Sequence, residues 1–155
     1  MMMSIALLFH VLAAVIWVGG MFFAFCFLRP SMEALSDTIE GPKRLTLWAT
    51  VFKKFFPWVW FSIVVLFFTG LYMMSQMGGL FGAGRYIYLM FGLAVVMTVI
   101  FKFVYLAPFR HLCRGVEEEK WEVAAFALGT IRKLVAVNLS IGILVIVSAT
   151  ALKFW

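Results

Sequence analysis

One histidine and a set of methionines are the residues of this chain best suited to hold a ligand. His10 is one of two histidines among 155 residues, and ten methionines accompany them. A neutral imidazole is the commonest metal ligand in proteins, and thioethers are soft donors that suit Cu(I). An ionisable group inside an apolar stretch is a functional candidate in a membrane protein. These residue types therefore indicate a soft metal ion, with copper as the first choice.

Other interpretations of the same residues stay open. A backbone carbonyl or a neighbouring hydroxyl would satisfy His10, and methionine fills gaps in any membrane core. Haem is the rival ligand, because histidine and methionine form a known axial pair. The other histidine, His111, cannot complete a bis-histidine haem site with His10 within one chain. It follows the third apolar segment at the opposite membrane surface, about 30 Å away.

Lys102 is the second ionisable group within an apolar stretch. It lies about two helical turns before the end of the third segment, at a depth similar to that of Asn138 in the fourth. A ligand with an anionic group, such as a porphyrin propionate, would suit this ammonium, and so would a polar gate shared with Asn138. The alternative is snorkelling, in which the four-carbon stem carries the charge to the interface.

Two hydroxyl groups of the second segment are weaker candidates. Ser62 and Thr69 share a stripe with Met73, at spacings of seven and four residues. Such hydroxyls bond either across helices or back to a carbonyl of their own helix. We favour the bond to a carbonyl of their own helix.

Four apolar segments must position these residues. They lie near residues 5–28, 55–74, 86–109 and 134–154. Each is long enough to cross a hydrocarbon core that needs about 20 helical residues, and separate spans in lipid must be helical. Only 13% of the chain is charged, against roughly a quarter in a soluble domain. We expect an all-α fold, a four-helix transmembrane bundle, as a single integral membrane domain over residues 1–155.

The connections between these spans are expected to be partly helical. Pro42 suits a first helical turn, so the second helix should begin well before its span and form an extension outside the membrane. Arg29-Pro30 is expected to end the first span, and Pro57 to kink or reset the second helix near the interface. The glycine-rich residues 78–84 predict a turn between the second and third spans.

The basic residues predict the orientation and the surroundings. Most lysines and arginines lie in the first and third connections, whereas Arg85 and Lys153 fall on the opposite face. By the positive-inside rule both termini should be periplasmic, in a bacterial inner membrane, with the helical extensions in the cytoplasm. The expected partner is the lipid bilayer and not nucleic acid, because the charges do not form one stripe. A homo-oligomer or a larger membrane complex stays open.

This topology decides what His10 can meet. The end of the second span and the start of the third lie level with it, and they hold Met73, Met74, Met77, Tyr86, Tyr88 and Met90. We predict a metal site of His10, Met73 and Met77 near the outer surface. Trp17 and Met21 follow His10 at helical spacing. We therefore predict Met21 as a further metal ligand and Trp17 as a cofactor contact.

The chain lacks the motifs of soluble enzymes. It has no nucleophile triad, phosphate loop or carboxylate pair, and all seven acidic residues lie in the connections. We favour a role without catalysis and assign no catalytic residue.

Several segments resemble small CopD-family (copper resistance D-like) inner-membrane proteins. The likeness is carried by HVLAAVIWVGGMFF from His10, FFPWVW from Phe55, APFR from Ala107 and VNLSIG from Val137. This resemblance implies copper binding or copper transport, with His10 as the residue that carries over. A more distant likeness to HemJ-type protoporphyrinogen oxidase implies a haem-b-binding membrane oxidoreductase, with His10 as axial ligand and Lys102 as propionate anchor. A third alternative is a non-catalytic assembly partner of a larger membrane complex.

Overall fold

The computed structural model describes residues 1–78 and 84–151, with the side chains of residues 85, 86 and 151 left aside. Over this part of the chain the secondary structure is helical, without strands. Four helices are long and apolar enough to cross a membrane. The predicted all-α fold with four membrane-spanning helices is therefore confirmed.

The first long helix runs from Met2 to Ala34. Its parts are α1 (Met2–Ala14), η1 (Val15–Gly19), α2 (Gly20–Phe23), η2 (Ala24–Leu28) and α3 (Arg29–Ala34). The segments η1 and η2 are π-helical turns, which hold an extra residue and change the direction in which later side chains point. Residues of α2 and α3 that keep the helical spacing of α1 therefore do not lie on the same face as those of α1.

The helix itself does not end at Pro30, where the first span was expected to end, and continues to Ala34. In a regular helix the proline ring collides with the carbonyl four residues earlier, and its nitrogen has no hydrogen to donate. Here the π-helical turn η2 comes directly before Pro30, and the N–H of Arg29 already reaches back five residues to the Ala24 carbonyl. The hydrogen-bond register has shifted before the proline enters, and the helix continues.

The second long helix, α4 (Gly41–Gln76), is 36 residues long, with Pro42 in its first turn and Pro57 in its interior. At about 1.5 Å per residue it measures about 54 Å, well above the roughly 30 Å of a hydrocarbon core. The predicted helical extension from Pro42 onward is therefore confirmed. The helix passes through Pro57 without a break. The glycine-rich connection that follows lies mostly outside the described residues.

Two closely joined helices and one long helix complete the bundle. They are α6 (Arg85–Leu106), α7 (Pro108–Glu117) and α8 (Trp121–Ala151). Gly115 in α7 lets this helix approach α8 closely, because a Cβ at Gly115 would lie 2.9 Å from the backbone nitrogen of Ala124. The turn between them uses a left-handed residue, Glu119, with φ of 55°. Together these features fold α7 back against the start of α8.

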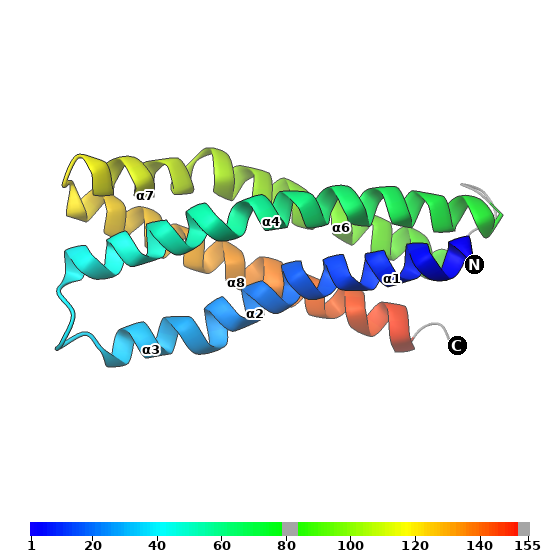
Figure 1. Ribbon diagram of the computed structural model, residues 1–155, viewed down its shortest axis with the longest axis horizontal. Coiled ribbons are helices and arrows are strands. Elements are labelled where there is room, and N and C mark those ends of the chain that lie inside the picture. Colours follow the sequence, from blue (N-terminus) through cyan, green and yellow to red (C-terminus); the bar gives the residue numbers. More distant parts are fainter. Residues whose placement is uncertain (79–83, 152–155) are drawn as a thin grey trace.

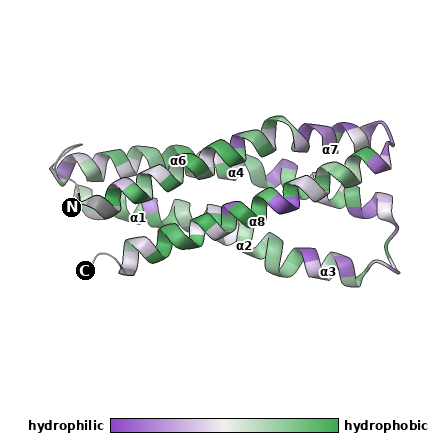
Figure 2. Ribbon diagram, turned by 180° about the vertical axis from the view of Figure 1, so that it is seen from behind, coloured by the Kyte–Doolittle hydropathy of each residue, from purple (hydrophilic) through white to green (hydrophobic). Residues whose placement is uncertain are grey.

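The long helices run side by side along the long axis of the molecule (Figure 1). The N-terminus and the last described turn of α8 lie at one end, here called the terminal end. The other end, here called the basic end, is formed by α3, the first turns of α4, and α7. Figure 2 shows the hydrophilic residues gathered mainly there, while the middle of the bundle is hydrophobic. This distribution is what a membrane-spanning bundle requires.

The helices associate unevenly along the bundle. Helix α1 packs mainly on α4, and α6 packs mainly on α8, whereas α4 and α6 contact each other little. Nearer the basic end, α7 joins α8 and α4. Five of the aromatic side chains buried or half-buried there form what we call the aromatic layer: Phe52, Phe56, Phe101, Tyr105 and Phe109. Phe56 lies at its centre, with ring centroids 4.7–5.2 Å from those of three of the others.

Candidate functional site

A large cavity of about 350 Å³ lies between the helices in the half of the bundle nearer the terminal end. All four long helices contribute to its wall. His10 lines it, together with five methionines from α4, the turn directly after it, and α6: Met73, Met74, Met77, Met90 and Met97. The other lining residues are aliphatic, aromatic or glycine. The cavity therefore combines one imidazole with several thioethers in an otherwise apolar space.

The His10 ring is held by a hydrogen bond to α4. Its Nδ1 lies 2.8 Å from the hydroxyl oxygen of Thr69. That hydroxyl has a single hydrogen, and it donates to the Val65 carbonyl at 2.6 Å. With its hydrogen in this short bond, the hydroxyl accepts from the imidazole, and Nδ1 then carries the ring hydrogen. The tautomer that results leaves the lone pair of Nε2 available to a ligand.

The same ring packs directly on the backbone of α4. A Cβ at Gly70 would lie 3.4 Å from Cε1 of His10 and 3.8 Å from its Nδ1. The glycine therefore gives the ring room beside the helix. His10 faces α4 and the large cavity, and it is half-buried.

Thr69 bonds in both of the ways that its sequence position allows. It accepts from His10 across the helix interface and donates to a carbonyl of its own helix, whereas the sequence analysis favoured the second bond alone. Ser62 is buried, and its hydroxyl has no hydrogen-bond partner within the described part of the chain. The two hydroxyl groups thus differ, because the hydroxyl of Thr69 contacts His10, the candidate metal-binding residue.

Most residues of the predicted site meet at this cavity. His10, Met73, Met77 and Trp17 all line it. Met21 does not. It lies eleven residues beyond His10, about 16 Å along the helix axis, with the π-helical turn η1 between them.

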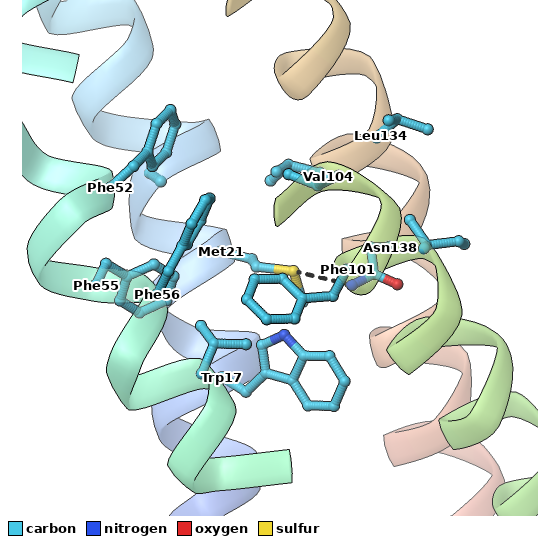
Figure 3. Close-up of a pocket in the computed structure, with 13 residues that line it drawn as sticks. Trp17, Met21, Phe52, Phe55, Phe56, Phe101, Val104, Leu134 and Asn138 are labelled. Carbon is cyan, nitrogen blue, oxygen red and sulfur yellow. Dashed lines mark hydrogen bonds between the residues drawn. The ribbon is translucent and has the colours of Figure 1, made fainter. Parts of the chain in front are cut away.

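Met21 instead lines a second, small cavity of about 20 Å³ that Trp17 also borders. Figure 3 shows Trp17 and Met21 facing Asn138 of α8 among aromatic side chains. The amide nitrogen of Asn138 donates to the sulfur of Met21 at 3.6 Å. Trp17 therefore lines both cavities.

Lys102 is not brought to His10 or to Asn138. Its side chain is exposed on α6, and it lines neither cavity. Tyr88 is 41% exposed and does not line the large cavity either. The side chain of Tyr86 lies outside the described residues.

Met97 was missed by the sequence analysis, and Met90 was noted for its depth without being assigned to the site. Both line the large cavity, together with Ala94 between them. The three residues are spaced by four and three positions, which places them on one helix face. That spacing was the available signal. It was hidden because α6 is apolar on all sides.

The large cavity is not a conventional cluster of metal ligands. Among the described residues, no three or more His, Cys, Asp or Glu side chains gather where they could hold a metal ion. Cys26 and Cys113 are free thiols, and neither lines either cavity. The other possible metal donors in the lining of the large cavity are thioethers. Such a set suits a soft monovalent ion such as Cu(I) better than a hard divalent one.

Comparison with protein families gives one match. A family model described as CopD, copper resistance protein D, matches residues 49–152, which is well over half of the chain. The matched region contains the five cavity methionines, whereas His10, Trp17 and Met21 precede it. Neither the search of curated proteins nor the search of solved structures gave a match.

Proposed function

This chain belongs to the CopD (copper resistance protein D) family, and we propose that it binds Cu(I) in the large cavity and passes it across a bacterial inner membrane. The observation that supports this proposal is that one histidine and five methionines line a single cavity. Cu(I) prefers soft thioether donors and also accepts imidazole. The rest of the wall is apolar and would exclude competing hard ligands.

The bond between His10 and Thr69 supports this assignment. Ligating histidines usually donate their second ring N–H to an oxygen acceptor, which fixes the tautomer and the ring orientation. Here Thr69 is that acceptor, at 2.8 Å. The lone pair of Nε2 is then the one that a metal ion would use.

We infer the sidedness of the site from the positions of the charges. The basic end would lie in the cytoplasm and both termini in the periplasm. The large cavity would then be near the periplasmic surface, and the aromatic layer would separate it from the cytoplasm. In this conformation the protein would accept copper from the periplasmic side.

The haem alternative loses the propionate anchor that the sequence analysis expected for it. Lys102, its expected propionate anchor, is exposed and lines neither cavity. A visible absorption spectrum of the purified protein provides a direct check. We expect no Soret band. A Soret band that disappears in His10→Ala would show that the ligand of His10 is haem and not copper.

The test of copper binding is a competition titration in detergent, with a chromogenic Cu(I) chelator as the probe. We expect His10→Ala to weaken Cu(I) binding by at least roughly 10-fold to 100-fold, the range seen when a partner of a metal ligand is lost. The control is His111→Ala, which removes the other histidine at an exposed position of α7. Equal affinity in the wild type and in His10→Ala would contradict the proposal.

A further inference from the structure

Three arginines from three of the long helices gather around one glutamate at the basic end. Arg29 and Glu33 belong to α3, Arg44 to α4 and Arg132 to α8. Nε of Arg29 donates to Oε1 of Glu33 at 3.0 Å, and Nη1 of Arg132 lies 3.6 Å from the same oxygen. Arg44 is close enough to interact electrostatically with both Glu33 and Arg132. In this cluster one acid faces three bases, which leaves an excess of positive charge.

Two of the guanidinium groups are held against aromatic rings. The central carbon of the Arg132 guanidinium lies 5.3 Å from the centroid of the Trp48 ring, and that of Arg29 lies 5.5 Å from the centroid of the Phe25 ring. A cation at such a distance from an aromatic face is attracted by the ring. Trp48 is buried, so the ring that carries Arg132 is itself fixed by its surroundings. Both groups are therefore positioned without depending on Glu33 alone.

These arginines have hydrogen-bond donors that the chain does not use. A guanidinium carries several N–H groups in a planar fork. Within the described part of the chain, Arg29 donates through Nε only, and the 3.6 Å between Arg132 and Glu33 is too long for a hydrogen bond. Nε of Arg132 is buried, but its terminal NH₂ groups are not, and 27% of the side chain is exposed. The terminal NH₂ groups of both arginines can therefore bind an anion.

The cluster lies where the hydrocarbon interior of the membrane ends. Arg29 comes directly after the apolar residues 5–28, and Arg132 comes just before the apolar segment that begins at residue 134. The polar headgroups of phospholipids lie at this level, outside the hydrocarbon core. Basic pockets between membrane helices bind anionic headgroups. Arginine suits a phosphate especially well, because its planar fork matches two phosphate oxygens.

We propose that Arg29 and Arg132 bind the phosphate of one anionic phospholipid, with Arg44 adding positive charge beside it. The phosphate accepts hydrogen bonds from the terminal NH₂ groups of both arginines and so links the first long helix to α8. On the membrane side of these arginines, Phe27 is 55% exposed and Val137 is 50% exposed, which leaves apolar surface for the acyl chains. The proposal does not depend on copper binding, since it uses residues of the basic end alone.

The experiment is native mass spectrometry of the full chain in a non-ionic detergent, titrated with phosphatidylglycerol. Phosphatidylcholine is the comparison lipid, because it has a phosphate but no net charge. We expect one phosphatidylglycerol to bind at least roughly 10-fold more tightly than phosphatidylcholine. Inorganic phosphate in excess should not displace it, because it lacks acyl chains. Equal affinities for the two lipids would overturn the proposal, and displacement by inorganic phosphate would overturn the assignment to a lipid.

Single substitutions locate the binding site. Arg132→Gln should weaken phosphatidylglycerol binding by roughly 10-fold or more, because it removes charge-assisted hydrogen bonds to the phosphate. The matched control is Arg110→Gln, at an exposed position of α7 at the same end. It changes the net charge equally and should weaken binding by no more than about 5-fold, the general attraction of one basic residue to anionic lipid. Equal losses in the two variants would overturn the proposal.

Two further variants keep the test decisive. Arg29→Gln, at a side chain that is 38% exposed, should weaken binding like Arg132→Gln and serves where the latter fails to fold. Glu33→Gln removes the carboxylate that competes with the lipid, while the Trp48 and Phe25 rings still hold the guanidinium groups. Phosphatidylglycerol binding should therefore tighten in Glu33→Gln. Weaker binding in this variant would mean that the arginines serve only to pair with Glu33, and would overturn the proposal.

Discussion

Towards the terminal end the bundle leaves a cavity of about 350 Å³, whereas beside the aromatic layer it leaves about 20 Å³. Methionines, aliphatic residues and glycines make up most of the lining of the first region, whereas aromatic rings from three helices contribute much of the lining of the second. Methionine is flexible and polarisable, so it can reshape around a ligand. Aromatic rings fill space with large rigid surfaces.

The two regions of this small membrane protein therefore differ in what their side chains can do. The aromatic layer supplies packing, because without a hydrophobic driving force between helices, association in lipid depends on close van der Waals contact. The large cavity gives up such contact and offers ligand donors in its place. Variants in the two regions should therefore affect different properties.

The largest effect on stability is expected in the aromatic layer. Phe56→Ala removes a ring that is 3% exposed and should lower the free energy of unfolding by about 3–5 kcal/mol. Thermal unfolding in detergent measures this. The control is Phe68→Ala, where the ring is 74% exposed. If Phe68→Ala proved as destabilising as Phe56→Ala, the aromatic layer would not be the packing centre.

The methionines should show the opposite behaviour. We expect Met90→Leu combined with Met97→Leu to weaken Cu(I) binding by about 10-fold or more, because leucine keeps the apolar volume but removes the sulfur donor. Stability should change by less than about 1.5 kcal/mol, as volume-conserving swaps do. Chelator competition and thermal unfolding on the same samples separate the two effects. The control is Met32→Leu, a half-buried methionine of α3 that lines neither cavity.

Thr69 tests whether the imidazole must be held in one tautomer. Thr69→Val keeps the shape of the side chain and removes the acceptor for Nδ1–H of His10. Loss of such a partner typically costs 10-fold to 100-fold in metal affinity, and we expect roughly 10-fold here. Thr69→Ser should restore the wild-type affinity, because it retains the hydroxyl. Full affinity in Thr69→Val would mean that the hydrogen bond is only structural.

The smallest effect is expected at the basic end. Lys53 and Glu117 form an ion pair of 3.2 Å between α4 and α7, with more than half of each side chain exposed. Exposed pairs contribute about 0–1 kcal/mol, and salt screens them. Lys53→Ala should therefore lower the unfolding temperature slightly at low salt and leave it unchanged at high salt. Copper affinity should be unaffected in both conditions.

The fold could be predicted because each apolar segment indicates a membrane-spanning helix independently of the other segments. Four apolar segments separated by charged connections define four spans regardless of packing detail. The continuation of the first helix past Pro30 could not be predicted in this way. It depends on the π-helical turn η2, a local geometry for which the apolar sequence carries no distinct pattern.

The level of the candidate-site residues along the bundle could be predicted from the sequence. The face of each helix that points inward could not. Topology placed His10 level with Met73 and Met77, and these residues do line one cavity. Which face of a helix points inward cannot be read from a segment that is apolar on every side. For this reason Met97 was missed, and the exposed position of Lys102 on α6 became evident only from the structure.

The most direct test of the copper site is X-ray absorption spectroscopy of the Cu(I)-loaded protein in detergent. The wild type should show sulfur scatterers together with one imidazole in the first coordination shell. In His10→Ala the imidazole signal should vanish while the sulfur signal remains. A spectrum without sulfur, or an imidazole signal that survives in His10→Ala, would contradict a copper site built from His10 and the cavity methionines.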